Sequence, residues 1–450
     1  MRILIINPAS LDETGRPQKH RKAYMPPLIL GILSSLTPKH HTVHCVNDIV
    51  EHVDYSVPYD LVAISAMTCQ AGRAYQIGDA FRERDVRVVI GGIHASIMPE
   101  EAKLHADAVA IGEADNLWER ILDDCEHNAL KDFYREDAFP DLDRLIVPRW
   151  DGIQWSNYPK RPGKKYPIIC LYTSRGCPMG CSFCSVTKYF GSSFRTRPVD
   201  HVLREIDALD ANDYFFIDDN IIFNADYSRE LFAAVEKRNI HWMGQFSTRV
   251  LKNPDLIGRA ARSGCYDAFI GMESINRDSL AGVKKSFNRT EEYEELFRRL
   301  MENGIMPTVS VILGFDEDDA CQFRLTLEFL RKNGIFYAIF FILTPAPGTA
   351  LYDAMSREGR IAHRNWSLYN GTNVVFRPKH FTEGELRDGY WKVFQEFYSM
   401  KNIPFHLAYS LRVRHNRMSA FADNLVFQFY FRSMVNRRVH PYSCFGKRVN

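Results

Sequence analysis

The sequence predicts an α/β protein that contains two successive parallel sheets and a helical carboxyl-terminal region. Short apolar segments alternate with amphipathic ones over residues 1–136, and the same alternation recurs six times over residues 166–350. Apolar strands that alternate with helices are typical of parallel sheets covered on both faces. Residues 137–165 are rich in proline and lack a clear period, which predicts a linker. Residues 351–450 show a mainly helical pattern and end in a basic tail.

The bulk composition is that of a folded protein of ordinary polarity. The chain has 450 residues, of which 46% are hydrophobic and 25% charged, and its formal net charge is +2. A chain this long can bury a large core without disulfides, and its small net charge argues against general nucleic-acid binding. No secretory signal is evident, and no run of about 18 apolar residues predicts a membrane span. We therefore expect a cytoplasmic protein whose cysteines serve as metal ligands before they form disulfides.

The first segment predicts a doubly wound, flavodoxin-like domain. Its five expected strands are Arg2–Ile6, Thr42–Val46, Asp60–Ser65, Val86–Ile90 and Ala108–Ile111. The helices expected between them are Leu28–Leu36, Ala71–Arg84 and Asp115–Cys125. Such a sheet binds ligands at the carboxyl ends of its strands. Polar or glycine-rich loops follow four of those ends, at residues 7–9, 65–69, 91–94 and 112–113.

The third segment predicts a partial (β/α)6 barrel of the TIM type. Its expected strands are Tyr166–Thr173, Asp213–Ile217, Ile240–Phe246, Tyr266–Ile270, Thr308–Leu313 and Phe336–Leu343. The expected helices are Val199–Leu209, Ser228–Arg238, Asp255–Ser263, Thr290–Asn303 and Ala320–Asn333. Chemistry in such barrels occurs at the carboxyl ends of the strands. Polar or thiol side chains follow all six predicted strands, which a purely structural barrel would not require.

Three cysteines follow the first barrel strand within eight residues. They are Cys177, Cys181 and Cys184, and Gly176 and Gly180 allow their loop to wrap closely around a ligand. A structural zinc site needs a fourth ligand, usually from a second Cys or His pair, and no such pair is evident. Thiolates suit iron–sulfur clusters, and three of them leave a fourth iron open. The alternatives are a zinc site or unrelated buried cysteines.

The C-x3-C-x2-C spacing, with Phe183 before the last cysteine, resembles the radical S-adenosylmethionine (SAM) superfamily. The resemblance implies a four-iron, four-sulfur cluster whose open iron chelates the amino and carboxylate groups of SAM, with Phe183 beside SAM. Electron transfer then breaks a sulfonium–carbon bond and gives the deoxyadenosyl radical. It also implies an electron donor such as flavodoxin or ferredoxin.

Charged side chains at other strand ends could complete a SAM pocket. Asp218, Asp219 and Glu273 can accept hydrogen bonds, and Arg249 offers a fixed cation for a carboxylate. The segments around Asp218 and Glu273 are similar to the corresponding family segments. That resemblance implies that Glu273 contacts the ribose or amino end of SAM and that Arg249 contacts its carboxylate end. The alternative is that each is a turn residue or belongs to a surface ion pair.

The first domain narrows the resemblance. Five segments occur in family order, namely Pro26–Leu28, Asp60–Ser65, Gly91–Ala95, Gly112–Ala114 and Pro345–Thr349. They resemble the cobalamin-binding radical SAM group, which includes the anaerobic magnesium-protoporphyrin ester cyclase and many carbon methyltransferases. The similarity covers about residues 1–375. It implies that the strand-end loops bind cobalamin through Ser65, Met67, Thr68, Gly91, Gly92, His94 and Glu113.

One cobalamin motif is absent. Many cobalamin domains carry Asp-x-His-x-x-Gly, whose histidine ligates cobalt from below, and this chain lacks that string. We therefore expect cobalamin to bind without a lower histidine ligand, above residues 67–70 or above an open face. The alternative is a degenerate domain that only docks on the barrel, since a fold alone does not fix function.

The carboxyl-terminal tail is strongly basic. Residues 401–450 hold nine Lys or Arg and one acidic residue, Asp423, which gives a net charge of +8. An amphipathic segment of this charge could rest on an anionic membrane or bind an anionic substrate. The alternative is a packed terminal helix with solvated arginines.

Together these patterns predict a cobalamin-dependent radical SAM enzyme that methylates an unactivated carbon of a small molecule in a biosynthetic pathway. One alternative is a cyclase, oxidase or rearrangement enzyme of the same architecture, with or without cobalamin. Another is a non-catalytic binding protein, and the intact cysteine triad argues against it. The sequence assigns no single side chain as a catalytic acid, base or nucleophile.

Overall fold

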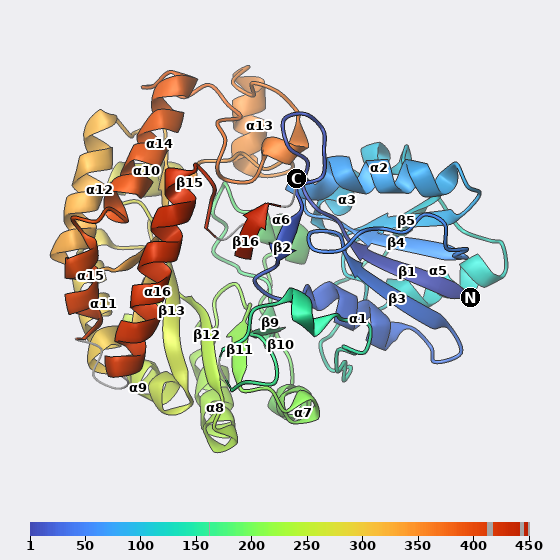
Figure 1. Ribbon diagram of the computed structural model, residues 1–450, viewed down its shortest axis with the longest axis horizontal. Coiled ribbons are helices and arrows are strands. Elements are labelled where there is room, and N and C mark those ends of the chain that lie inside the picture. The colour runs from blue at the N-terminus through green and yellow to red at the C-terminus, as the bar shows by residue number, and fades with distance from the viewer. Residues whose placement is uncertain (162, 412–416, 442–444, 449–450) are drawn as a thin grey trace.

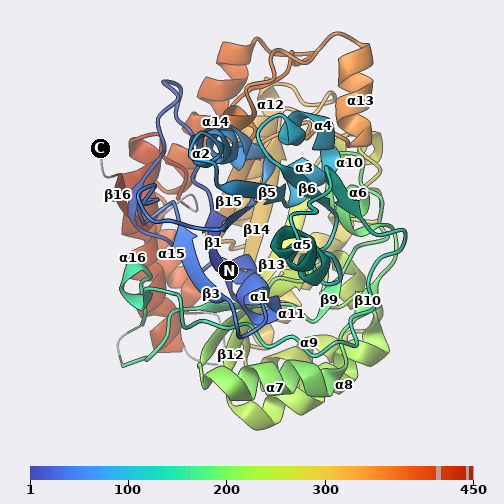
Figure 2. The same ribbon diagram turned by 90° about the vertical axis from the view of Figure 1, so that its right-hand side faces the viewer.

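The computed structural model describes residues 1–161, 163–411, 417–441 and 445–448. It contains two six-stranded parallel sheets that lie next to each other and are covered by helices (Figure 1). Figure 2 views the molecule from the side of the first sheet, with the barrel strands behind it. No helix within these residues is long and apolar enough to cross a membrane.

The first sheet has the strand order β3-β1-β4-β5-β6-β7, and all its strands are parallel. The strands are β1 (Arg2–Asn7), β3 (Thr42–Asn47), β4 (Leu61–Ser65), β5 (Arg87–Gly91), β6 (Ala108–Ile111) and β7 (Phe133–Arg135). The first five have the flavodoxin-like order that the sequence predicts. Strand β7 was not predicted, because three residues are too few to show a strand period.

Helices cover both faces of the first sheet. They are α1 (Leu28–Leu36), α2 (Ala71–Arg82), α3 (Ile93–Ile97), α4 (Pro99–Lys103) and α5 (Leu117–Glu126). Ile3 and Ile5 of β1 belong to the apolar core that includes α1 and α5. Leu4 and Ile6 belong to the core that includes α2. Successive residues of β1 therefore face opposite helix layers, which explains its continuous apolar run.

The second sheet has the order β15-β14-β13-β12-β11-β8, so its parallel strands follow one another in the sequence. They are β8 (Ile169–Leu171), β11 (Asp213–Phe216), β12 (His241–Phe246), β13 (Cys265–Glu273), β14 (Met306–Leu313) and β15 (Tyr337–Ile342). The helices of these repeats are α7 (Val199–Leu209), α8 (Ala225–Val235), α9 (Asp255–Arg262), α11 (Tyr293–Glu302) and α12 (Ala320–Lys332). Because β8 and β15 are both edges, the barrel is incomplete, as the six repeats predict.

Short elements that the sequence did not reveal surround the cysteine loop and the rim. They are β9 (Ser174–Arg175), β10 (Arg195–Thr196), α6 (Val186–Phe190) and α10 (Arg277–Gly282). Strands β9 and β10 pair antiparallel. Elements of two to six residues have no measurable period, so tertiary contacts rather than local pattern define them.

The carboxyl-terminal region covers the β15 edge of the barrel (Figure 1). Its elements are α13 (Ala350–Arg357), α14 (Glu383–Phe397), α15 (Ile403–Ser410) and α16 (Arg417–Asn436), and β16 (Phe445–Arg448) pairs with β2 (His20–Lys22). The hydroxyl of Tyr398, directly after α14, donates to Ala338 O at 2.9 Å. Residues 412–416, 442–444 and 449–450 of the basic tail lie outside the described residues.

One apolar core joins the two sheets. It includes Ile3 and Ile5 of the first sheet and Trp242 of the barrel. Cys170 in β8 is buried in it, and its Sγ lies 3.6 Å from the Sδ of Met25, near the start of α1. The two sheets therefore present their carboxyl ends in a fixed relation to each other.

Candidate active site

The three cysteines lie on the loop between β9 and α6, beyond the carboxyl end of β8. All three are half-buried free thiols. The Cys184 amide donates to Cys181 O at 3.1 Å, and Thr187 Oγ1 donates to Cys177 O at 3.2 Å. These hydrogen bonds shape the loop, and backbone N–H groups also act on the thiols, that of Met179 on Cys177 and that of Val186 on Cys184.

The donor set suits an iron–sulfur cluster. Cys177, Cys181 and Cys184 form an all-sulfur set of three within one loop. A structural zinc site usually takes four ligands, whereas three thiolates fit a cluster in which each binds a different iron.

Two cations face the cysteine loop. Burial raises the pKa of all three thiols, and that of Cys184 to about 12. Lys285 acts to lower the pKa of each thiol, and Arg249 acts in the same direction on Cys177. These cations therefore favour the thiolate form that metal binding requires.

Gly176 makes the start of this loop possible. Its φ is +91°, and a Cβ atom there would lie 2.2 Å from the carbonyl oxygen of Ser193. Both the left-handed backbone and the close approach require glycine. Gly180 has a φ of +67°, but a Cβ there would meet nothing within 4 Å, so its requirement is conformational alone.

Asp218 holds the stem of the cysteine loop. Its Oδ1 accepts a hydrogen bond from Thr173 Oγ1 at 2.7 Å and one from Ser174 Oγ, and its Oδ2 accepts one from Thr173 N at 3.1 Å. The side chain is buried, at 1% exposure. Its predicted contact with SAM stays a prediction. The geometry gives it a different role, because these hydrogen bonds tie β8 and β9 to the end of β11.

Glu273 ends β13 in the left-handed region, with a φ of +63°. Its Oε1 accepts a hydrogen bond from Lys285 Nζ at 2.7 Å, and its Oε2 accepts one from Ser310 Oγ at 2.9 Å. Burial acts to lower the pKa of Lys285, but Glu273 and Cys181 outweigh it and raise that pKa above its ordinary value. Lys285 lies 5.8 Å from the ring centre of Phe183. It thus links Glu273 to the cysteine loop.

Arg249 and Asp219 complete the rim. Arg249 lies in the turn after β12, over the ring of Phe223 at 5.3 Å, and no carboxylate in the described part of the chain pairs with it. Asp219 is half-buried, and burial followed by the charge of Asp218 raises its pKa to about 6. The rim therefore gathers three thiols, two cations and two carboxylates, a set that can hold a cluster and a zwitterionic ligand.

The carboxyl edge of the first sheet is lined by small residues. Ser65, Gly91 and Gly92 border a cavity of about 60 Å³ between the strand ends and helices α1 and α5, and Tyr189 of α6 also lines it. Met67 is 56% exposed at the end of β4, and Thr68 begins the short turn of residues 68–70. Doubly wound sheets bind ligands at this edge, so these five predicted residues are placed where a ligand can reach them.

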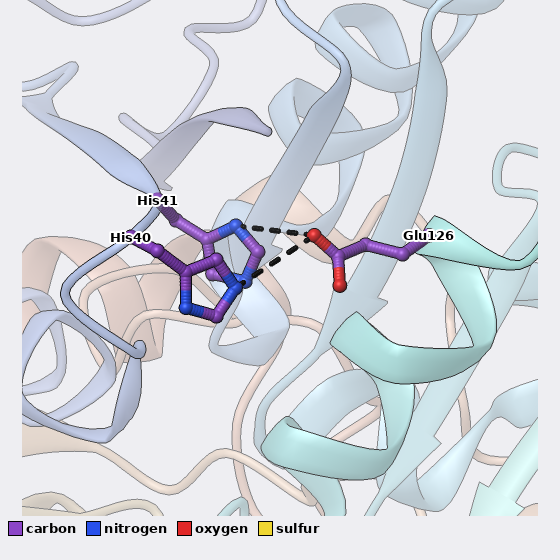
Figure 3. A group of neighbouring side chains, drawn as sticks. All are labelled: His40, His41 and Glu126. Carbon is purple, nitrogen blue, oxygen red and sulfur yellow. Dashed lines mark ion pairs between the residues drawn. The ribbon is translucent and has the colours of Figure 1, made fainter.

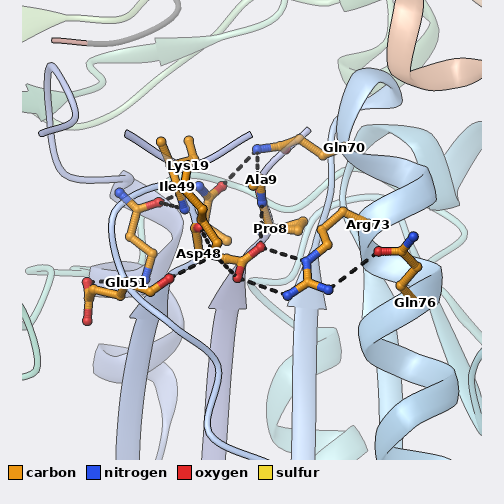
Figure 4. A network of polar contacts seen from close by, with 11 residues as sticks. Pro8, Ala9, Lys19, Asp48, Ile49, Glu51, Gln70, Arg73 and Gln76 are labelled. Atoms are coloured by element: carbon orange, nitrogen blue, oxygen red, sulfur yellow. Dashed lines mark hydrogen bonds and ion pairs between the residues drawn. The ribbon is translucent and has the colours of Figure 1, made fainter. Parts of the chain in front are cut away.

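A buried polar network fixes the loops at this edge (Figure 4). Asp48, with 0% exposure, accepts hydrogen bonds from Ala9 N at 3.1 Å, Arg73 Nε at 2.9 Å and Lys19 Nζ. Gln70 donates to the carbonyl oxygen of Pro8 at 2.6 Å. The network joins the loop after β1 to the loop after β4, which is the switch point of the strand order. Sequence reasoning missed it because its members are far apart in the chain.

His94 and Glu113 do not face that cavity. His94 is buried with its Nε2 3.4 Å from Glu101 and its ring 5.4 Å from that of Trp366. Glu113 is 7% exposed and forms ion pairs with Arg175 and Arg195. Their predicted contacts with cobalamin stay predictions, and the geometry assigns both side chains to contacts between regions of the protein.

His40, His41 and Glu126 form a separate cluster of side chains (Figure 3). Glu126 Oε1 lies 3.6 Å from His41 Nδ1 and 3.8 Å from His40 Nε2. The two histidines precede β3 and therefore lie at the amino ends of the strands. His41 Nδ1 is also 3.1 Å from the amino group of Met1, which occupies the atom that a metal would use. We assign no metal to this cluster.

Two family models match separate parts of the chain. The model of the Radical SAM superfamily matches residues 171–330, and the model of the B12 binding domain matches residues 36–122. The first match begins at the end of β8 and includes the cysteine loop. The second includes the strand ends of β4, β5 and β6.

Two curated relatives come from Chlorobaculum tepidum. Bacteriochlorophyllide d C-12(1)-methyltransferase is 32% identical over 83% of this chain and 82% of that protein. Bacteriochlorophyllide d C-8(2)-methyltransferase is 30% identical over 88% of this chain and 90% of that protein. A more distant relative, the anaerobic magnesium-protoporphyrin IX monomethyl ester cyclase of Cereibacter sphaeroides, is 25% identical over 82% of this chain and 65% of that protein.

A solved structure shares the fold. It is the radical SAM methyltransferase TsrM from Kitasatospora setae, with cobalamin and a [4Fe-4S] cluster bound. The two structures align with a TM-score of 0.60 and 16% sequence identity, over 79% of this chain and 75% of that chain.

Proposed function

The chain belongs to the cobalamin-dependent radical SAM methyltransferase family, and from that premise we propose that it methylates an unactivated carbon of a chlorin-type tetrapyrrole. The observation that carries the proposal is the cysteine loop, which faces two cations at the barrel rim and docks against the ligand edge of a cobalamin-type sheet. Two relatives that are 32% and 30% identical act on bacteriochlorophyllide d by name, and they support the substrate class.

The rim residues fit the cluster and SAM. Cys177, Cys181 and Cys184 would hold the cluster, because they are three thiols on one loop that two cations face. When bound, the cluster supplies the electron that cleaves SAM, and cobalamin carries a methyl group to the substrate carbon. Arg249 would bind the carboxylate of SAM, since its guanidinium is charged and has no carboxylate partner in the described chain.

Three further residues would orient SAM. Asp219 and Glu273 offer carboxylate oxygens for its amino or ribose groups, and Phe183 provides an apolar side next to Lys285. Lys285 would offset the negative charge of the thiolates and of Glu273. Asp218 would act by holding the loop stem, since its oxygens already accept hydrogen bonds from Thr173 and Ser174.

Cobalamin would lie at the edge of the first sheet, against Ser65, Met67, Thr68, Gly91 and Gly92. The buried position of His94, against Glu101 and Trp366, supports the expectation that no histidine ligates cobalt from below. Electron paramagnetic resonance (EPR) of the reconstituted Co(II) protein tests this point. The expected spectrum lacks nitrogen superhyperfine splitting from an axial histidine.

We propose four regions along the chain: a cobalamin domain at 1–136, a linker at 137–165, a radical SAM barrel at 166–350 and a helical region at 351–450. The cobalamin-type sheet ends at Arg135, and the barrel strands lie between Ile169 and Ile342. Both support these divisions.

The experiment is anaerobic reconstitution with iron, sulfide and hydroxocobalamin, followed by incubation with a bacteriochlorophyllide, SAM and a reductant. Mass spectrometry should find a product heavier by one CH₂ group, together with 5′-deoxyadenosine and S-adenosylhomocysteine. The cyclase relative motivates a second candidate function. A cyclase would form a new ring without adding the mass of a methyl group, so the same measurement separates the two reactions.

The partners are proposals of the same kind. A flavodoxin or ferredoxin would supply the electron, and the free thiols and cluster suit a cytoplasmic location.

Helix α16 exposes Leu425, Val426 and Phe429 beside a strongly basic tail, which suits peripheral contact with an anionic membrane. Co-flotation with vesicles containing an anionic lipid, and none with neutral vesicles, is the expected result.

A further inference from the structure

Both flanks of the cysteine loop are attached to one loop of the first sheet, residues 112–115 between β6 and α5. On the amino-terminal flank, Arg175 directly precedes Gly176 and forms ion pairs with Glu113 and Asp115. On the other flank, the hydroxyl of Tyr189 in α6 donates to the carbonyl oxygen of Gly112 at 2.9 Å. The loop that carries the thiols is therefore held at both ends by the same short segment of the other sheet.

The ion pairs are buried and balanced in charge. Arg175 Nη1 donates to Glu113 and to Asp115 Oδ2 at 2.8 Å, and Arg195 donates to Glu113 Oε1 at 2.5 Å. Arg175, Glu113 and Asp115 are 9%, 7% and 6% exposed. Two guanidinium groups thus meet two carboxylates away from water. Buried charges are costly unless they are paired, so this arrangement disfavours other relative positions of the two loops.

The network continues in both directions. Asp218 of the barrel binds Thr173 and Ser174, the two residues before Arg175. On the other side, Gly112 N donates to Ser96 Oγ at 2.8 Å, and Ser96 Oγ donates to Gly92 O at 2.7 Å. A series of polar contacts therefore runs from the ligand edge of the first sheet to the residue next to the cysteine loop.

We infer that Arg175 is a positioning residue that fixes the cluster relative to the cobalamin edge. The inference rests on the proposed function, because a reaction that uses both cofactors on one substrate needs them at a set separation. Arg175 is paired with Glu113 and Asp115, so it acts through the loops that it joins. Small displacements of reacting groups can cost about a hundredfold in rate.

The test weakens the ion pairs of Arg175 without replacing Arg175 itself. In a Glu113→Gln/Asp115→Asn variant, Arg175 loses both charged partners. Pulsed EPR of the holoenzyme measures the distance between Co(II) and the reduced cluster, and we expect a broader or shifted distribution than in the wild type. Iron content and the cluster spectrum should be unchanged. SAM cleavage to 5′-deoxyadenosine should continue, while methylated product per 5′-deoxyadenosine falls at least about tenfold.

A matched control separates positioning from general stability. Glu205→Gln breaks the buried Arg197–Glu205 pair, at 2.6 Å, which lies within the barrel region and does not join the sheets. It should leave the cobalt–cluster distance unchanged. Should the double variant fail to fold, Asp115→Asn alone gives a milder form of the test, because Glu113 then still pairs with Arg175.

The outcomes are distinct. A wild-type distance distribution and product ratio in a folded variant with full cobalamin and iron would overturn the positioning role. A wild-type protein that binds no cobalamin would instead overturn the proposed function. Asp115→Glu keeps the charge that Asp115→Asn removes. A narrower cobalt–cluster distance distribution in Asp115→Glu than in Asp115→Asn would support the role of charge pairing.

Discussion

The two ligand edges of this molecule use their charged residues in opposite ways. At the barrel rim, Arg249 has no carboxylate partner among the described residues, and Asp219 is half-buried. At the edge of the first sheet, Asp48 is enclosed by two cations and Glu113 by two arginines. Within the described chain, the rim therefore keeps charged groups without an opposite partner, Arg249 among them, whereas the charges at the edge of the first sheet hold loops in place.

The contrast indicates which kind of ligand each edge suits. The rim offers thiolates and ions, which suit a cluster and a zwitterionic cosubstrate. The first sheet offers Ser65, Gly91 and Gly92 around a narrow cavity, which suits recognition by shape. Changes of charge should therefore matter most for binding at the rim, and changes of bulk should matter most at the sheet.

The largest effect should come from the thiolates of the rim. Replacing Cys177, Cys181 or Cys184 by Ala should abolish cluster assembly and the formation of 5′-deoxyadenosine, because a methyl group cannot bind iron. Iron and sulfide analysis together with product chromatography measures this. Cys170→Ala is the control, since that thiol is buried in the core next to Met25. Continued SAM cleavage in the triple Ala variant would contradict the assignment.

The next effect concerns stability at the first sheet. Asp48→Asn should lower the free energy of unfolding by about 3 kcal/mol, because it leaves two cations beside a neutral side chain in a buried site. Lys19 and Arg73 have side chains only 15% and 12% exposed. Urea unfolding of the apo protein gives the value. Asp255→Asn, which loses an exposed pair with Arg229, should cost less than about 1 kcal/mol. Equal losses of unfolding free energy in Asp48→Asn and Asp255→Asn would show that the buried pairs of Asp48 are no more stabilising than an exposed pair.

At the rim, neutralising Arg249 should weaken SAM binding and leave the fold intact. A charged hydrogen bond contributes about 1.5–3 kcal/mol, so Arg249→Gln should lower SAM affinity about tenfold to a hundredfold. Equilibrium dialysis measures the affinity, and the cluster spectrum should stay unchanged. Arg262→Gln, at an exposed site on α9, is the control. Glu273→Gln should also weaken SAM binding, and it removes the charged partner of Lys285 at the same time.

A change of bulk should separate the two edges. Ser65→Leu places a large side chain in the cavity of about 60 Å³ and should lower cobalamin retention about tenfold, since overpacking costs about 1–3 kcal/mol. SAM affinity should stay the same. Optical spectra after desalting measure bound cobalamin, and Ser356→Leu on exposed α13 is the control. A variant that retains full cobalamin would show that the cavity is not part of the cobalamin site.

The sequence predicted the fold closely where the apolar pattern was complete. Helix α1 and strand β6 have the expected bounds, because each is a mainly apolar run that begins directly after Pro27 or Asp107. Strand β7 and the β9–β10 pair were missed, because two or three residues carry no period. The spacing of the three cysteines was enough to predict the cysteine loop, because all three thiols lie within one short segment of the chain.

The charge pairs of the site could not be predicted in the same way. Arg175 and Glu113 are 62 residues apart, and Lys285 and Glu273 are 12 apart. Only the docking of the two sheets and the turn after α10 bring these groups together. The sequence therefore shows that an acidic residue follows a strand end. It does not show whether that residue binds a ligand or pairs with an arginine. That is why Glu113 was predicted at a cofactor and lies in an ion pair.

The smallest expected effect is a pH dependence that belongs to the rim alone. Burial, and then the charge of Asp218, raises the pKa of Asp219 to about 6. A raised acid pKa means that the carboxylate is neutral below that pH, so its attraction for cationic SAM is present above the pKa and is lost as the pH falls through it. SAM affinity should therefore be about twofold lower at pH 6 than at pH 8.

Equilibrium dialysis across this range tests the effect. Asp219→Asn should give a lower affinity that no longer changes with pH, whereas Asp226→Asn, at a residue that is 96% exposed, should keep the wild-type profile. A profile in which wild-type affinity stays constant from pH 6 to pH 8 would place Asp219 outside the SAM site, and the recognition of SAM by charge would then depend on Arg249 and the Glu273–Lys285 pair.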